Sequence, residues 1–250
     1  GSSAFPNSAE ATNVESPSHT TIGQDNHIYS IDAAQDQGSS SAFGNQNLVK
    51  GQHANAFGDG NDAYGKQTQS FGDNNKIYAD SSVGFGANNT AGKYSDTDPQ
   101  ATRTADANTG SVAIFGLNNN VVGKNILAVG KDNKVTDDTT TNATVIGFNA
   151  TASSANATAI GTAASALANE TIAIGQAAKA SGQNSNAYGS QANASGTSSL
   201  AVGTGSVSSG DSAVAIGNDS TVTGDSAVAI GASATSTGKW STALGDSANA

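Results

Sequence analysis

A glycine that follows a large apolar residue recurs every fourteen residues along most of this chain. The phrase occurs with phenylalanine in the first half, as at Phe43-Gly44, and mostly with aliphatic residues in the second half. Ile22-Gly23 is a first copy, offset by an irregular spacer. The repeat glycines are Gly44, Gly58, Gly72, Gly86, Gly116, Gly130, Gly147, Gly161, Gly175, Gly189, Gly203, Gly217, Gly231 and Gly245. A sustained period of this kind is typical of repeat architectures.

Each repeat reads as two short strands joined by turns. With the repeat glycine counted as position 0, positions −3 and −1 are often large and apolar, as Val214 and Ile216, while position −2 is usually Ala, as Ala215. Such alternation predicts a strand. Small residues follow at positions +3 and +5, and a second glycine, such as Gly224, stands at position +7. Fourteen residues are too few for helical repeats, so the sequence predicts an all-β parallel β-solenoid with coils of about 14 residues.

The composition excludes several partners. Leu, Ile, Val and Phe are scarce enough to predict disorder, but the fixed period argues against it. The 20 acidic residues outnumber the 10 basic ones and give a net charge of −10, so nucleic acid and anionic membrane surfaces are poor partners. There is no Cys, and no apolar segment is long enough to insert into a bilayer.

Energetics predict more than one chain. One coil buries about two large side chains at ~1.5–3 kcal/mol each, whereas ordering each of its backbone residues costs about 1–2 kcal/mol. We expect the large residues to fill the coil and the Ala column to face outward. A long outward stripe of small apolar residues allows close approach of another chain, so we expect a homotrimer or another cyclic oligomer packed along it.

The period divides the chain into an irregular N-terminal segment, residues 1–22, and a repetitive region, residues 23–250. Insertions interrupt the repeats at about 87–110 and 131–143. They are either tolerated loops or loops that contact a ligand or a neighbouring subunit.

Two further features stand out. Six asparagines share position +3, which predicts a hydrogen-bonded ladder or a turn, or alternatively a ligand-binding row. Trp240 occupies the position that Ser212 and Ser226 hold in neighbouring coils. Three interpretations are open: the side chain packs between subunits, it marks a change of architecture, or it contacts a partner. The asparagines are Asn47, Asn61, Asn75, Asn89, Asn119 and Asn133.

No catalytic, metal or cofactor site is predicted. His19, His27 and His53 are scattered, and none has a carboxylate at the spacing of metal ligands. No nucleophile, base and orienting group can be assembled, so we expect that the protein is not an enzyme and needs no cofactor.

The segment from Ser212 to Ser220, repeated from Ser226 to Ala234, resembles the head repeats of the YadA-like trimeric autotransporter adhesins. The family phrase is N-S-V-A-I-G-x-x-S. The first two positions differ here, as Ser212 and Ala213. The likeness covers most of residues 40–250. The matching residues are Val214, Ala215, Ile216, Gly217 and Ser220.

The resemblance implies a left-handed parallel β-roll with three chains around one axis. It implies an extracellular passenger head on the bacterial outer membrane, involved in virulence and cell adhesion, without its stalk and anchor. Such heads bind extracellular matrix proteins such as collagen, host cells or other bacteria. The five matching residues, together with Trp240, are the candidate ligand-binding residues, and exposed Ser and Asp residues at the turns are candidates for direct contacts.

Three alternatives remain at this point. The head is a structural spacer or protective coat, an ice-binding solenoid, or a carbohydrate-active β-helix enzyme. Ice binding requires a Thr-x-Thr ladder, which only Thr221-x-Thr223 and Thr235-x-Thr237 supply.

Overall fold

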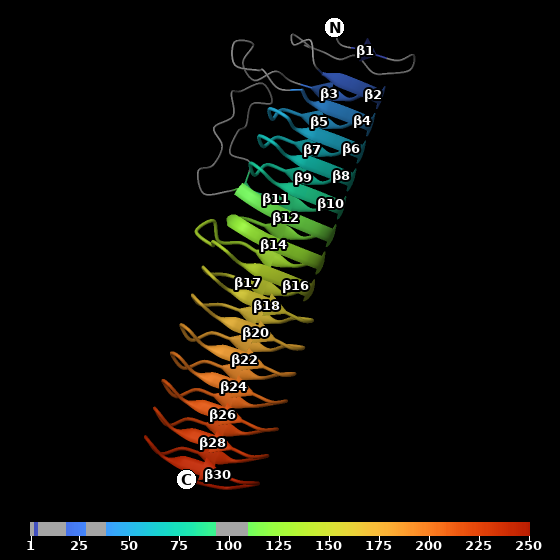
Figure 1. Cartoon of the computed structure of the whole chain (residues 1–250). Coiled ribbons are helices and arrows are strands. Elements are labelled where there is room, and N and C mark those ends of the chain that lie inside the picture. Colours follow the sequence, from blue (N-terminus) through green and yellow to red (C-terminus); the bar gives the residue numbers. More distant parts are fainter. Residues whose placement is uncertain (1–2, 5–18, 29–38, 94–109) are drawn as a thin grey trace. The chain divides into compact units, whose positions relative to one another are not determined.

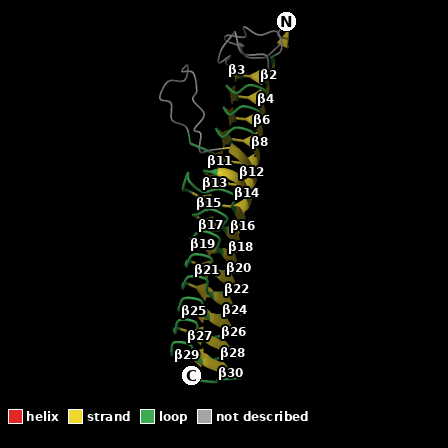
Figure 2. Cartoon of the chain, turned by 60° about the vertical axis from the view of Figure 1, so that its left-hand side comes forward, coloured by secondary structure: helices red, strands yellow, loops and turns green. Residues whose placement is uncertain are grey.

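Short parallel strands form nearly all the regular structure of this protein (Figure 1). The computed structural model describes residues 3–4, 19–28, 39–93 and 110–250. It divides into two compact units, Gly1–Lys131 and Asp132–Ala250. Within each unit the chain passes alternately through a first and a second sheet, so each coil contributes one strand to each (Figure 2).

The first unit pairs its strands in register across successive coils. Gly58 lies opposite Gly44 on one side and Gly72 on the other. The first sheet contains β1 (Ser3–Ala4), β2 (Thr20–Gln24), β4 (Ser41–Asn45), β6 (Asn55–Asp59), β8 (Gln69–Asp73), β10 (Val83–Ala87), β12 (Gly110–Leu117) and β14 (Lys124–Lys131). The second sheet contains β3 (His27–Ile28), β5 (Leu48–Val49), β7 (Asp62–Ala63), β9 (Lys76–Ile77), β11 (Thr90–Ala91) and β13 (Asn120–Val121).

The second unit repeats this pattern with an offset of fourteen residues from Thr144 onward, whereas Lys134 pairs with Thr151, seventeen residues away. Ala215 pairs with Ala201 and Ala229. The first sheet contains β16 (Thr144–Phe148), β18 (Thr158–Ile160), β20 (Ile172–Ile174), β22 (Asn186–Tyr188), β24 (Leu200–Val202), β26 (Val214–Ile216), β28 (Val228–Ile230) and β30 (Thr242–Leu244). The second contains β15 (Lys134–Val135), β17 (Thr151–Ala152), β19 (Ser165–Ala166), β21 (Lys179–Ala180), β23 (Asn193–Ala194), β25 (Val207–Ser208), β27 (Thr221–Val222) and β29 (Thr235–Ser236). The parallel β-solenoid with coils of about 14 residues is confirmed.

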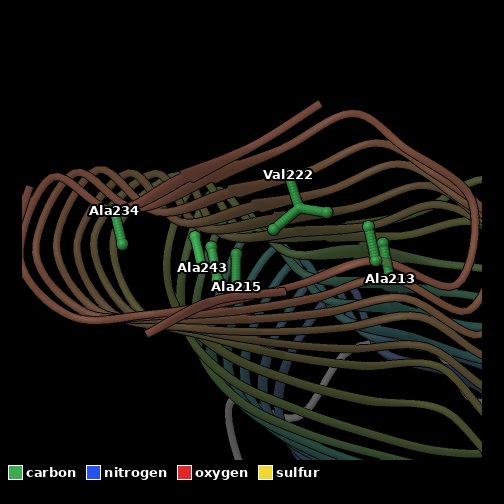
Figure 3. Packing of buried hydrophobic residues seen from close by; sticks show 7 residues of the cluster. Ala213, Ala215, Val222, Ala234 and Ala243 are labelled. Atoms are coloured by element: carbon green, nitrogen blue, oxygen red, sulfur yellow. The ribbon is translucent and has the colours of Figure 1, made fainter. Parts of the chain in front are cut away.

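The side chains that fill the interior of the coil are not those that the sequence predicts. Ala215 is fully buried and points, like Val222 from the opposite sheet, into the space between the two sheets (Figure 3). Val214 and Ile216 face outward and are half-buried. The prediction that Ala faces outward and the large residues fill the coil was therefore wrong. Alternation separates two faces without identifying the inner one, and here the narrow inner space accommodates small side chains.

The glycines at position 0 and those at position +7 differ in backbone conformation. Gly217 has φ = +138°, a conformation that residues with a Cβ rarely adopt. Gly210, at position +7, needs no such φ, but a Cβ there would lie 2.2 Å from the carbonyl oxygen of Gly224 in the next coil. Both glycine columns allow close stacking, since a Cβ at Gly217 would also lie 2.2 Å from the carbonyl oxygen of Gly231, and the first column additionally allows the turn.

The irregular segments are only partly described. Residues 94–109, which make up most of the predicted insertion at 87–110, lie outside the described residues, as do residues 1–2 and 5–18 of the N-terminal segment. Ser3–Ala4 pairs with Thr20 and Thr21. In the insertion at 131–143, the amide of Thr140 donates to the carbonyl of Asp137 at 3.0 Å. Across the described ranges, no helix is long and apolar enough to cross a membrane.

Candidate binding surfaces

The structure distributes the predicted repeat-phrase residues over both faces of the coil. Ala215 and Ser220 are completely buried, and the Ser220 hydroxyl donates to the carbonyl of Gly217 at 3.1 Å. Val214 and Ile216 face away from the interior. These residues therefore form no single cluster: three shape the coil, and two belong to its outer surface.

The outward residues of the first sheet form an apolar surface in the second unit, which we call the outer stripe. It consists of positions −3 and −1 of successive coils, aligned by the register, so that Ile216 lies between Val202 and Ile230. Ile230, the last residue of β28, is 39% exposed although it has a paired neighbour on each side, Ile216 and Leu244. Its apolar members are Ile146, Ile160, Ile172, Ile174, Tyr188, Leu200, Val202, Val214, Ile216, Val228, Ile230 and Leu244.

Position −1 carries a ladder of stacked phenylalanines in the first unit. Consecutive ring centroids of Phe43, Phe57, Phe71, Phe85 and Phe115 are 4.6–5.4 Å apart, and consecutive planes differ by at most 7°. Phe85 and Phe115 are about 40% exposed. Each ring covers the face of the next, so the ladder presents ring edges outward. Ring edges suit packing against another apolar surface better than stacking on a flat ligand.

The asparagines at position +3 form a buried ladder inside the first unit. Asn61 donates through Nδ2 to Asn47 Oδ1 at 3.1 Å, and its own Oδ1 accepts from the backbone and side-chain amides of Asn75, both at 3.1 Å. Each Nδ2 from Asn47 to Asn119 also donates to a repeat-glycine carbonyl of the next coil. The ladder prediction is confirmed for Asn47 to Asn119, and Asn26 extends the ladder, whereas Asn133 lies in the second unit, where its Oδ1 accepts from the Ala150 amide at 3.0 Å. The amides are satisfied within the coil, which speaks against a ligand-binding row.

A polar and aromatic cluster lies on the second sheet of the first unit. Lys50 is only 5% exposed, and its Nζ lies 5.0 Å from the centroid of the Tyr64 ring. The Tyr78 hydroxyl donates to Asp62 Oδ2 at 3.5 Å. Burial raises the pKa of Asp62, while the charge of Lys76, the Tyr78 hydrogen bond and the charge of Lys50 act in the opposite direction.

An open cavity of about 350 Å³ lies beside this cluster. It is lined by Asn74, Lys76, Asn88 and Thr90, which come from two adjacent coils. The four lining side chains are polar and include one positive charge, so the cavity offers hydrogen bonds to a ligand.

Trp240 lies at the corner that precedes the last strand of the first sheet. Its side chain is 72% exposed, and the Nζ of Lys239 lies 4.7 Å from the ring centroid. The backbone has φ = +60°, as it does at Ser212 and Ser226, which have φ = +54° at the corresponding corner. The sequence prediction that Trp240 shares the position of these serines is therefore confirmed.

The family model for the YadA head domain repeat matches the second unit six times. The matched ranges overlap and cover residues 141–164, 166–192, 187–206, 194–220, 208–234 and 223–248. Residues 141–248 are therefore similar to YadA head repeats. A comparison with curated proteins gave no match.

The match to the YadA head repeat relates the coils of the second unit to a known family of repeats. Repeats of this kind are typical of the heads of trimeric autotransporter adhesins. The first unit lies outside the match, yet its coils keep the same register, with Gly44, Gly58 and Gly72 at positive φ and aligned in neighbouring strands. It is a β-solenoid of the same coil length with phenylalanine in place of the aliphatic residues.

Among the described residues, no three His, Cys, Asp or Glu side chains lie close enough together to hold a metal ion. YadA-type heads are typically non-enzymatic.

Sequence reasoning missed the outer stripe and the cluster around Tyr64. The signal for the stripe was present as alternating large and small residues, whereas the Tyr64 cluster had no sequence motif.

Proposed function

We propose that this chain is the head of a homotrimeric autotransporter adhesin at the bacterial cell surface. In this proposal it attaches the outer membrane of the bacterium to a host matrix protein such as collagen, to host cells or to other bacteria. The observation that carries the proposal is the outer stripe of the matched repeats, a continuous apolar surface left uncovered within one chain. The family match supports the same conclusion.

The outer stripe accounts for assembly because the coil interior is small. In the coil of Gly217 the buried positions hold Ala213, Ala215, Ser220 and Val222. Their burial contributes little, since Ala and Ser have little apolar surface to remove from water. The large side chains of the coil, Val214 and Ile216, remain half-exposed until another copy covers them. Three copies packed through their outer stripes would bury the largest apolar surface that the second unit offers.

Assembly through the outer stripe assigns the candidate ligand-binding residues two roles. Val214 and Ile216 act at the contact between copies, while Ala215, Gly217 and Ser220 maintain the coil. Their substitution would reduce adhesion through the fold and the assembly. Direct contacts come instead from exposed turn residues, such as Asp219 and Ser226, and from Trp240. Three copies on one axis would strengthen weak contacts by avidity.

A solid-phase assay tests adhesion. The protein, residues 1–250, is added to wells coated with collagen, with other matrix proteins or with host cells. Adhesion predicts saturable binding to at least one surface and loss of binding for Ile216→Asp, which places a charge in the outer stripe. The matched control is Ile216→Leu, which keeps the same position of the outer stripe apolar and should bind as the parent protein does. Binding to no surface of the panel would contradict the adhesive function.

The alternative function is a structural spacer or protective coat. It is favoured by the uniformity of the second unit, in which every first-sheet strand from β18 to β30 has three residues. A spacer predicts an intact trimer that binds none of the coated surfaces.

A further inference from the structure

The corner that precedes each first-sheet strand forms an exposed column in the second unit. The column residue of each coil has φ between +54° and +60° and a backbone amide that bonds to the preceding coil. Polar residues occupy it in the coils before Trp240: Asn156, Glu170, Asn184, Ser198, Ser212 and Ser226. All of these are exposed. Side chains at this corner are therefore exposed in every one of these coils, and the exposure of Trp240 follows from its position in the column.

The fold does not require Trp at this corner, although the Lys239 ammonium lies over its ring. Its amide donates to the carbonyl of Asp225 at 3.0 Å, the same bond that Ser226 makes to Asp211 at 2.7 Å, so Ser satisfies the backbone equally well. A bulky residue at positive φ is disfavoured, and an indole that is 72% exposed keeps most of its apolar surface in water. A residue that costs free energy in the unliganded chain is a candidate for a contact with another molecule.

The surroundings of the ring narrow the class of ligand. The neighbours at the corner, Lys239, Ser226 and Asp225, are polar and exposed, so the indole is one flat apolar plate within a polar surface. A peptide anchor requires an apolar pocket with several neighbours. A pyranose ring instead presents one C–H face to an aromatic plate and hydroxyl groups to polar residues at its edge. Exposed carboxylates at Asp211, Asp225 and Asp246, with a net charge of −10, disfavour sulfated or acidic sugars.

We propose that Trp240, with Lys239 and Ser226 beside it, is a stacking site for a neutral or N-acetylated hexose of a surface glycan. The site rests on the proposed adhesive function and gives it a ligand class. The indole stacks on the sugar ring through the face opposite Lys239, whose ammonium lies over the other face of the ring, and the Ser226 hydroxyl provides a hydrogen bond to a sugar substituent.

The single tryptophan of the chain allows a direct test, because its emission reports on this site alone. Residues 1–250 are titrated with an N-acetylglucosamine tetramer and with a neutral galactose-containing oligosaccharide, and affinity is measured by calorimetry. We expect a saturable blue shift with at least one of them. Trp240→Ser should weaken the affinity by about tenfold, equivalent to a stacking contact of about 1.4 kcal/mol. Trp240→Tyr should restore part of it.

The serine variant keeps the fold intact, because Ser occupies the same corner at Ser212 and Ser226. The matched control is Glu170→Ser, at the same column in another coil, which should leave the affinity unchanged. Equal affinity of Trp240→Ser and the parent protein, or no response to either sugar, overturns the proposal. A third result would also overturn the proposal. If the Trp240 emission is already blue-shifted without sugar and shifts to the red on dilution, a second copy of the chain covers the indole ring.

Matrix and cell adhesion of the same proteins separates this proposal from the proposed function. If the head adheres while Trp240→Ser changes neither sugar binding nor adhesion, the stacking site is wrong and the adhesin remains. If sugar binding depends on Trp240 but the head adheres to no surface, the stacking site remains and the adhesive function is wrong.

Discussion

Replacing Asn61 with Ala tests whether the buried ladder stabilises the first unit. The Asn61 side chain is fully buried and donates to Asn47 Oδ1 at 3.1 Å and to the carbonyls of Phe57 and Gly72. Its Oδ1 accepts from the backbone amide of Asn75 at 3.1 Å. The substitution removes all these bonds and leaves the Asn75 amide without this acceptor.

The expected loss follows from the kinds of bond removed. A buried amide deprived of its acceptor costs about 1–3 kcal/mol, and each neutral hydrogen bond lost costs about 1 kcal/mol net. Because Asn61 Nδ2 carries two hydrogens for its three acceptors, two donated bonds are counted, and the sum is roughly 3–5 kcal/mol in the free energy of unfolding. The matched control is Asn55→Ala, because the Asn55 side chain is only half-buried and donates to Gln69 Oε1 at 3.1 Å. It should lose about 0.5 kcal/mol or less.

Urea unfolding followed by circular dichroism measures the loss, and hydrogen exchange locates it. We expect the amides of the coil containing Asn75 to exchange faster in Asn61→Ala than in Asn55→Ala, by about a hundredfold for each ~2.7 kcal/mol lost. If both variants unfold within about 0.5 kcal/mol of each other, the ladder does not stabilise the coil as argued.

Three further substitutions test other parts of the account. Gly210→Ala should cost about 3 kcal/mol or more in urea unfolding, because its Cβ would meet the Gly224 carbonyl, whereas the exposed Thr204→Ala should change little. Ala215→Leu should cost about 1–3 kcal/mol by overpacking the interior, whereas Ile216→Leu on the outer face should cost less; equal costs would contradict the orientation of the strand. Burial raises the pKa of Asp62, so the Asp62 carboxyl stays protonated to higher pH in the folded state than in the unfolded state. The free energy of unfolding therefore falls as the pH rises from the ordinary carboxyl pKa through the raised one. Asp62→Asn should abolish that fall in urea titrations across this pH range, and an unchanged fall would assign it to another group.

The sequence was sufficient to predict the features that depend on period alone. When coils stack with an offset of fourteen, residues fourteen apart become neighbours, so the Asn47–Asn61 hydrogen bond and the Phe43–Phe57 stack follow directly from spacing. The same reasoning gave the two strands of each coil.

The sequence could not reveal which face of the strand is the interior. Ala215 and Ile216 alternate identically whether the coil is wide or narrow, and the separation of the sheets depends on both walls together. The usual association of large apolar residues with the interior therefore failed for one chain.

The sequence did not predict the non-glycine residues that adopt positive φ at the corners of the coils either. Ala177 has φ = +54°, against the preference of Ala, because its amide donates to the carbonyl of Thr162 at 2.8 Å in the preceding coil. The stack imposes that conformation, so residue preference did not predict it. For the candidate site, the sequence identified Trp240 as unusual but not the exposure of its column.

The mass of the folded protein in solution tests the central claim most directly. If copies of the chain cover one another's outer stripes, sedimentation equilibrium at micromolar concentration should give three times the 24.4 kDa of one chain, with a β-sheet circular dichroism spectrum. A folded species that stays at the mass of one chain over the whole concentration range would contradict the account.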